Sequence, residues 1–279
     1  HEMHISHVIR GEDHISNTPK QLLIQQAFGW EVPLYAHLPL LLGTDRSKLS
    51  KRHGATAVRD YKAAGYLPGA LVNFLALLGW NPGDNRELFS LQELEQEFTL
   101  EKVQKAGAVF NEEKLVWINQ QYIMKKISLD DLVTQSKPFV SDSSVSSDML
   151  KRILQVEKPR ITKLSDIINM IPLYMEDPAY NPQLLSWKGT QVVTNVKEHL
   201  SRVRELLCDI PEQDFFDMDT LQKAIGPYAA VNGKGNVLWP LRAALSGKEE
   251  SPGPFEIMFV VGKETTLRRI DKALELIEK

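Results

Sequence analysis

Strand-like patterns in this 279-residue chain are concentrated in its first 55 residues and are sparse in the rest, where helical patterns dominate. The apolar run at residues 5–9 predicts a short strand, and residues 38–42 predict a second strand that ends at a Gly-Thr-Asp turn. Between them a helix is expected, because Asn17 or Thr18 can cap it, Pro19 suits its first turn and Gly29 its end. This order predicts a βαβ unit with a parallel strand pair. Two strands do not complete a sheet, so the unit is expected to need neighbours that this chain does not supply.

Helical periodicity continues from residue 55 to the end of the chain, so the second half is predicted to be all-α. Glycines end the first two helices, at Gly65 and Gly79, and Ser90 is placed to cap a third. Residues 137–147 are the best candidate for a surface loop, and a short strand around Val109 is left open. The predicted helices cover residues 57–65, 68–78, 90–98, 112–120, 148–157, 163–168, 183–187, 190–207, 218–226, 236–246, 255–262 and 263–278.

Composition excludes several classes of protein. The hydrophobic fraction of 43% and charged fraction of 25% are typical of soluble globular proteins. Cys208 is the only cysteine, which excludes a disulfide framework and a cysteine-rich zinc site and fits a reducing cytoplasm. No apolar run approaches the roughly 20 residues of a membrane span, so no membrane partner is expected. No metal site is predicted, because His1, His4 and His7 have no cysteine or acidic cluster nearby.

The strongest chemical signal is Lys48-Leu49-Ser50-Lys51-Arg52, which is followed by His-Gly and lies just beyond the second predicted strand. Ligands of open α/β sheets bind outside the carboxyl ends of the strands, where this loop is expected. Its two lysines can place cations around a polyphosphate and neutralise the charge that builds on a leaving pyrophosphate. A Lys-x-x-Lys motif alone is most often a solvated basic loop, so its surroundings decide between the two readings.

The loop and its surroundings resemble the bacterial-type glutamyl-tRNA synthetases, a family of class I aminoacyl-tRNA synthetases. In that family the lysine loop typically reads Lys-Leu-Ser-Lys-Arg and is followed by His-Gly. The resemblance covers nearly the whole chain and is weakest between residues 127 and 189. The other matching segments are residues 7–14, 16–19, 21–23, 28–30, 36–40, 60–61, 65–68, 73–80, 110–111, 114–115, 117–119, 240–247, 251–253 and 255–256.

The resemblance implies a two-step reaction. Glutamate and ATP, with Mg²⁺, form glutamyl-adenylate, and the glutamyl group then moves to the terminal adenosine of a tRNA. Lys48 and Lys51 are the implied catalytic residues. For Leu41, packing in the core is nearly as good an interpretation as contact with the nucleotide. The implied ATP-binding residues are Lys48, Lys51, Arg52, Asp13, His14 and Leu41.

Arg10 is the implied ligand of the substrate glutamate. It lies near the end of the first predicted strand, and its fork of donors suits a carboxylate. On general grounds a strand-end arginine more often forms a surface ion pair, here with Glu12 or Asp13. The resemblance favours substrate binding over that alternative.

Contacts with tRNA are implied across the helical part, with acceptor-stem contacts after the loop and anticodon contacts in the last two helical bundles. Residues 240–242 are expected to open a helix after the stretch 232–236, where an arginine suits phosphate or base contact. Trp239 could stack on an unpaired base, with burial as the alternative. The implied partner is tRNA(Glu), with tRNA(Gln) left open, and a monomer is expected. The candidate tRNA-binding residues are Trp239, Pro240, Leu241 and Arg242.

The predicted fold is therefore mostly α. The C-terminal remnant of a Rossmann-type α/β catalytic domain is followed by helical stem-contact and all-α anticodon-binding domains. The expected boundaries are residues 1–55 for the catalytic part with the lysine loop and 56–124 for the stem-contact region. Residues 125–190 and 191–279 are the two expected anticodon-binding subdomains.

The His-Ile-Gly-His element of this family does not occur in the sequence. His4-Ile5-Ser6-His7 and His14-Ile15-Ser16-Asn17 resemble it, but serine replaces the glycine that lets ATP approach the backbone. We therefore expect an upstream part to be missing and the chain alone to be inactive. The alternative is a non-catalytic tRNA-binding protein of the same family, against which the intact lysine loop argues. A short paralogue that glutamylates a tRNA base and the glutaminyl enzymes, with their β-barrel anticodon region, fit the long helical part less well.

Overall fold

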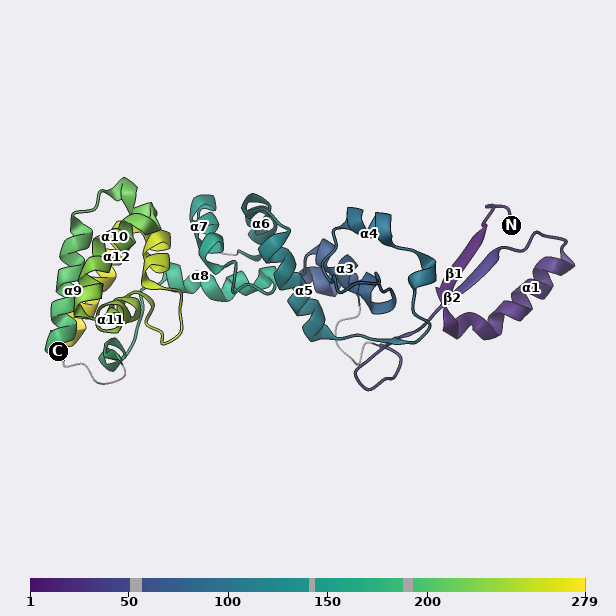
Figure 1. Cartoon of the computed structure of the whole chain (residues 1–279), viewed down its shortest axis with the longest axis horizontal. Coiled ribbons are helices and arrows are strands. Elements are labelled where there is room, and N and C mark those ends of the chain that lie inside the picture. Colours follow the sequence, from purple (N-terminus) through teal and green to yellow (C-terminus); the bar gives the residue numbers. More distant parts are fainter. Residues whose placement is uncertain (51–56, 141–143, 188–192, 279) are drawn as a thin grey trace. The chain divides into compact units, whose positions relative to one another are not determined.

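The computed structural model describes residues 1–50, 57–140, 144–187 and 193–278. The chain divides into two compact units. Unit 1 consists of His1–Ile127 and Thr162–Leu164, and unit 2 consists of Ser128–Ile161 and Ser165–Lys279. Helices dominate both units, and the strands of the described residues all belong to unit 1 (Figure 1). The predicted mostly-α fold is confirmed, whereas the division into four domains stays a prediction.

Unit 1 begins with the predicted βαβ unit. Strands β1 (His7–Gly11) and β2 (Leu34–Leu38) pair in parallel, with α1 (Thr18–Ala27) between them in the sequence. The first strand lies two residues later than predicted. The second predicted strand, residues 38–42, is wrong in its bounds, because Pro39 has no N–H to continue a ladder.

The last two residues of that predicted strand form part of a second, shorter strand pair. Residues of β3 (Leu41–Leu42) pair in parallel with β4 (Ala108–Val109), so the short strand left open around Val109 is present. The pairing joins segments more than 60 residues apart in the sequence. It therefore ties the start of the lysine loop to the helical part of unit 1.

The two faces of the β1–β2 pair differ in character. Arg10 and His37, which are opposite one another in the register, lie on the face covered by α1. The other face carries Ile9, Leu34 and Leu38, which are 50%, 67% and 36% exposed. Among the described residues, β1 and β2 pair with no further strand. Within the described residues this face of the strand pair therefore leaves apolar side chains exposed.

Buried carboxamides hold the helical part of unit 1 together. Asn73 Oδ1 accepts a hydrogen bond from Phe89 N at 2.5 Å, and Asn119 Oδ1 accepts one from Leu67 N at 2.8 Å. Asn119 Nδ2 also donates to Thr162 O at 2.5 Å, which attaches Thr162–Leu164 to this unit. The remaining elements of unit 1 are η1 (Glu12–Asn17), α2 (Val58–Ala63), α3 (Pro68–Gly79), α4 (Leu91–Glu97), η3 (Leu100–Lys102) and α5 (Glu112–Lys125).

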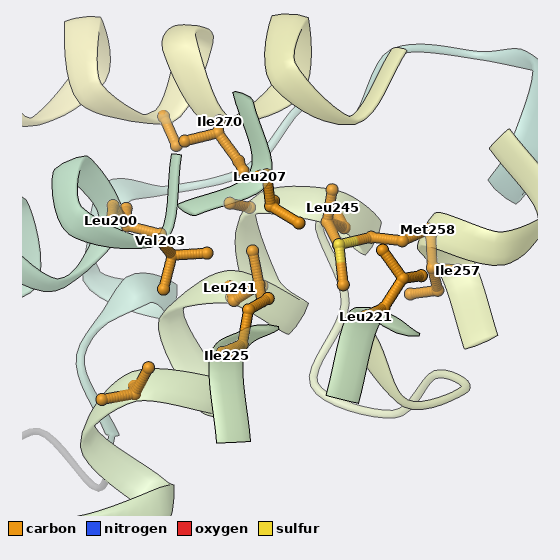
Figure 2. Packing of buried hydrophobic residues seen from close by; sticks show 14 of the residues in the cluster. Leu200, Val203, Leu207, Leu221, Ile225, Leu241, Leu245, Ile257, Met258 and Ile270 are labelled. Carbon is orange, nitrogen blue, oxygen red and sulfur yellow. The ribbon is translucent and has the colours of Figure 1, made fainter. Parts of the chain in front are cut away.

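Unit 2 is built on a large apolar core (Figure 2). Its second half consists of α9 (Val193–Cys208), α10 (Met218–Asn232), α11 (Lys234–Ser246) and α12 (Pro254–Glu278). Leucines and isoleucines at helical spacing point inward from these helices, and each fully buried one stabilises the fold by about 1.5–3 kcal/mol. The labelled core residues are Leu200, Val203, Leu207, Leu221, Ile225, Leu241, Leu245, Ile257, Met258 and Ile270. The other elements of unit 2 are α6 (Leu129–Ser136), η4 (Lys137–Phe139), α7 (Ser147–Glu157), α8 (Ile167–Met175), η6 (Pro182–Leu185) and η8 (Glu212–Phe216), and η5 (Leu164–Asp166) begins in unit 1.

Several helix predictions can be compared with these bounds. The predicted break at Gly262 is confirmed, since its φ of 79° and ψ of 178° interrupt α12. The cap at Ser90 is confirmed, because its side chain accepts a hydrogen bond from Glu93 N. Helix α6, which Ser128 caps, was not predicted. The helix predicted at residues 183–187 is wrong, because this segment forms a short 3-10 turn that starts at Pro182.

One arginine is buried at the centre of unit 2. The side chain of Arg269 on α12 is fully buried, and its guanidinium donates to four backbone carbonyl oxygens at 2.6–3.3 Å. Three of these belong to the C-terminal end of α8 or just beyond it, and Leu245 O belongs to the end of α11. Terminal carbonyls of a helix have no partner inside the helix and carry partial negative charge, so one cation satisfies two helix ends. The four acceptors are Leu173 O, Tyr174 O, Glu176 O and Leu245 O.

We predict that Arg269→Met lowers the free energy of unfolding by about 3 kcal/mol, because four carbonyls lose their donor and two of these hydrogen bonds are fully buried. Urea denaturation followed by circular dichroism measures the change. The neighbouring Arg268→Met is the matched control. Arg268 is 48% exposed and pairs with Asp177 at 3.0 Å, so its loss should cost less than about 1 kcal/mol. Equal effects of the two substitutions would contradict the role assigned to Arg269.

Candidate functional site

A short hairpin at the end of β3 presents the first lysine of the loop. Gly43 N donates to Ser47 O at 2.8 Å, and Leu42 and Lys48 face each other in an antiparallel bridge. Asp45 Oδ1 closes the turn by accepting hydrogen bonds from Ser47 N at 2.9 Å and Ser47 Oγ at 2.8 Å. Lys48 therefore has a defined position on unit 1. Lys51 and Arg52, the other predicted cations of the loop, lie outside the described residues.

The hairpin rests on β4. Phe110 N donates to Leu42 O at 2.8 Å, and a side chain at Gly107 would place its Cβ 3.2 Å from Leu40 O. Leu41, a predicted ATP-pocket residue, is 38% exposed and accepts a hydrogen bond at its carbonyl from Leu49 N. Its side chain is thus accessible beside the lysine hairpin rather than buried in the core.

Lys48 is paired with another predicted ATP-site residue. Its Nζ lies 2.7 Å from Asp13 Oδ2, with side-chain exposures of 61% and 39%. The hydrogen bond from Lys48 lowers the pKa of the Asp13 carboxyl below its ordinary value. Gly11 makes room for that carboxylate, since a Cβ there would lie 2.5 Å from Asp13 Oδ1. His14, which was also predicted to line the ATP site, is exposed on η1.

Arg10 is held by uncharged partners. Its Nη2 donates to Thr18 Oγ1 at 2.8 Å and to Gln21 Oε1 at 2.7 Å, both on α1. Its Cζ lies 5.3 Å from the centre of the Tyr35 ring. Glu12 instead accepts a hydrogen bond from Leu40 N, and Asp13 pairs with Lys48. The surface ion pair considered as the alternative is therefore not formed, and within the described ranges Arg10 has no carboxylate partner.

Unit 2 contains a pocket of about 430 Å³ that combines three cationic side chains with two carboxylates. We call it the basic pocket. Its volume lies within the range of small-ligand sites in proteins. Except for Arg242, its lining residues were not predicted as functional. They are Glu157, Arg160, Asn169, Met170, Leu173, Arg242, Lys248, Glu250, Ser251 and Pro252.

The four predicted tRNA-contact residues differ in accessibility. Helix α11 begins at Lys234, so the expectation that residues 240–242 open a helix is wrong. Because Pro240 lies inside the helix on its buried side, its side chain and that of Leu241 pack in the core and are not available to RNA. Trp239 donates from Nε1 to Leu184 O at 2.8 Å, and Arg242 Cζ lies 4.5 Å from the centre of its ring. Of these four predicted residues, only Arg242 lines the basic pocket.

Comparison with known proteins identifies both units. Residues 1–117 match the model of the class I tRNA synthetase catalytic domain (E and Q), and residues 131–274 match the anticodon binding domain. A glutamate–tRNA ligase from Chloroherpeton thalassium is 40% identical over 297 residues, covering 100% of this chain and 57% of that protein. The chain belongs to the glutamate–tRNA ligase family. The family predicted from the sequence is thereby confirmed.

Other members agree in sequence and in structure. A glutamate–tRNA ligase from Desulforamulus reducens is 37% identical, covering 99% of this chain and 58% of that protein. The crystal structure of a glutamate tRNA ligase from Elizabethkingia meningosepticum, in complex with its amino acid, superposes with a TM-score of 0.84 and 34% identity. It too is covered over 58% of its length, so this chain spans less than two thirds of these ligases.

Two general properties of the described residues bear on the site. No group of three or more His, Cys, Asp or Glu side chains in these ranges could hold a metal ion. No helix in the part of the chain that the structure describes is both long and apolar enough to cross a membrane.

We predict that Asp13 titrates below its ordinary pKa of 3.8 and that Lys48→Met raises its pKa towards that value, because the hydrogen bond from Lys48 is the largest cause of the shift. Since the pKa is lowered by folding, the ion pair is complete above the ordinary value and is lost as the pH falls through the lowered one. Carboxyl ¹³C NMR measures both midpoints. Identical midpoints in the two proteins would contradict the pairing.

Proposed function

We propose that this chain forms part of an enzyme that attaches glutamate to tRNA(Glu) through glutamyl-adenylate, with ATP as the second substrate. The Lys48–Asp13 pair carries the proposal. It places the first lysine of the loop beside the turn that follows β1, where ligands of α/β sheets bind. The carboxylate of glutamate attacks the α-phosphorus of ATP, and the bond to pyrophosphate breaks. The ribose hydroxyl of the terminal adenosine then attacks the acyl carbon and releases AMP.

The residues of unit 1 have distinct roles in this proposal. Lys48, with Lys51 and Arg52, neutralises charge on the departing pyrophosphate. Asp13, His14 and Leu41 line the nucleotide side. Arg10, which lacks a carboxylate partner among the described residues, binds a carboxylate of the substrate. No residue of this chain is assigned to the Mg²⁺ that accompanies ATP, which is usually bound by substrate phosphates with one or two carboxylates.

Unit 2 supplies tRNA recognition in this proposal. The basic pocket lies inside the segment that matches the anticodon binding domain and contains Arg160, Arg242 and Lys248. Cations in a concave site of this size suit an unpaired nucleotide, whose base edge and phosphate both present acceptors. Residues 56–124 are proposed to contact the acceptor stem. The four proposed domains keep the boundaries given above.

The alternative function is a tRNA-binding protein without catalysis, which the absence of His-Ile-Gly-His from this sequence favours. The two functions differ in whether the lysine loop is used. The experiment supplies, as a separate polypeptide, the segment of the Chloroherpeton thalassium ligase that this chain does not match. Glutamate-dependent pyrophosphate exchange that appears in the mixture, and is abolished by Lys48→Met, supports the enzyme. If the mixture binds tRNA but shows no pyrophosphate exchange, the result supports the non-catalytic alternative.

We predict that the chain by itself catalyses no glutamate-dependent pyrophosphate exchange, because its sequence contains no His-Ile-Gly-His element to complete the ATP site. The assay measures incorporation of labelled pyrophosphate into ATP. Robust exchange by the chain alone would show that the second half-site is not required.

We predict that Arg242→Ala weakens binding of tRNA(Glu) by about five- to a hundredfold, as expected for the loss of one arginine contact to RNA. Filter binding at fixed salt measures the change. Arg202→Ala is the control, since Arg202 lies on α9, is 51% exposed and pairs with Glu205. It should change the affinity by less than about twofold. An equal loss in both variants would indicate non-specific attraction instead of a contact in the basic pocket.

A further inference from the structure

A carboxylate occupies a core position of α7. Five residues of this helix are buried, and four of them, Leu150, Ile153, Leu154 and Glu157, fall at i, i+3, i+4 and i+7; the fifth is Val156. The fourth position is normally apolar in such a stripe. Glu157 is only 3% exposed and is the last residue of the helix, where the helix dipole disfavours negative charge. A buried carboxylate at this place requires strong partners.

Two side chains supply these partners. Tyr174 Oη donates to Glu157 Oε1 at 2.6 Å, and Arg160 Nη1 lies 3.6 Å from Glu157 Oε2. Burial raises the pKa of Tyr174 well above its ordinary value, so its hydroxyl keeps the proton that it donates. Tyr174 is itself fixed, because its carbonyl accepts a hydrogen bond from Arg269.

Arg160 connects this buried pair to the basic pocket. Its side chain is 43% exposed, and it also contacts Val156 O at 3.1 Å and Glu256 Oε2 at 3.4 Å. Two oxygens at Nη1 and one at Nη2 restrain the guanidinium, and enough of the side chain stays exposed for a ligand to reach it. A guanidinium in a fixed plane selects acceptor pairs by geometry, whereas a mobile one attracts any anion.

We infer that Glu157 is a positioning residue for base recognition: with Tyr174 it orients Arg160, so that the basic pocket selects one unpaired tRNA base by its acceptor edge. The inference rests on the proposed role of the pocket in tRNA recognition. It adds that selectivity depends on two residues that the ligand does not touch. Although Glu157 borders the pocket, it is only 3% exposed, so we infer that it acts through Arg160 and not by contacting RNA itself.

The test uses the full chain and anticodon stem–loop hairpins of tRNA(Glu), one with the natural loop and three with a single anticodon base replaced. Glu157→Gln keeps the size of the side chain and removes its charge, and Tyr174→Phe removes only the hydroxyl. Both should reduce discrimination at the same one anticodon position by about five- to tenfold and leave the other two positions unchanged. In an Arg160→Ala background neither substitution should change the discrimination further.

Glu250→Gln is the matched control. Glu250 lines the same pocket. Among the contacts of the described residues, Glu250 forms no hydrogen bond or ion pair with Arg160. It should shift the affinity for all four hairpins alike. Loss of discrimination at every position, or effects that add to Arg160→Ala, would overturn the inference and leave a purely structural role for Glu157. If the unmodified chain itself shows no preference for the natural loop, the proposed function of the pocket fails and the inference fails with it.

Discussion

The geometry of unit 2 depends on the buried guanidinium of Arg269. It donates to carbonyls at the ends of α8 and α11, two helices that both contribute to the wall of the basic pocket. One of its acceptors is Tyr174, whose hydroxyl binds Glu157, and Glu157 in turn contacts Arg160 at the pocket. A continuous chain of hydrogen bonds and ion contacts therefore runs from the core to Arg160 at the basic pocket. Such a network is costly to leave half satisfied, so it holds the pocket in one shape.

Unit 1 uses strand pairing for the same purpose. The hairpin that carries Lys48 is fixed by the β3–β4 pair and by the ion pair with Asp13, which are contacts to segments distant in the sequence. The ion pair is exposed and weak, so it positions Lys48 without locking it. In the proposed reaction, such a mobile attachment would let Lys48 follow the charge that builds on the leaving pyrophosphate. Arg10, by contrast, is held by uncharged hydrogen-bond partners on α1, which leaves its charge available to a carboxylate.

Local sequence signals predicted much of this fold. The βαβ order, the cap at Ser90 and the break at Gly262 follow from periodicity, capping and glycine conformation. The partner of β3 could not be predicted, because it lies more than 60 residues away. Arg269 sits in an ordinary helical segment whose sequence does not indicate burial. For Glu157 a signal existed: it falls on the apolar stripe of α7, and a charged residue at such a position marks a buried polar contact.

The lysine motif stood out in the sequence itself, and the resemblance decided between its two readings and pointed to Arg242. Arg160 and Lys248 emerged only from the pocket that they line with Arg242. The most direct test of the pocket is photo-cross-linking of tRNA(Glu) that carries 4-thiouridine in the anticodon loop, with the attachment sites mapped by mass spectrometry. We predict cross-links to residues of the basic pocket, including Met170 and Lys248. Cross-links confined to unit 1, or to α9, would contradict the assignment of the anticodon to this pocket.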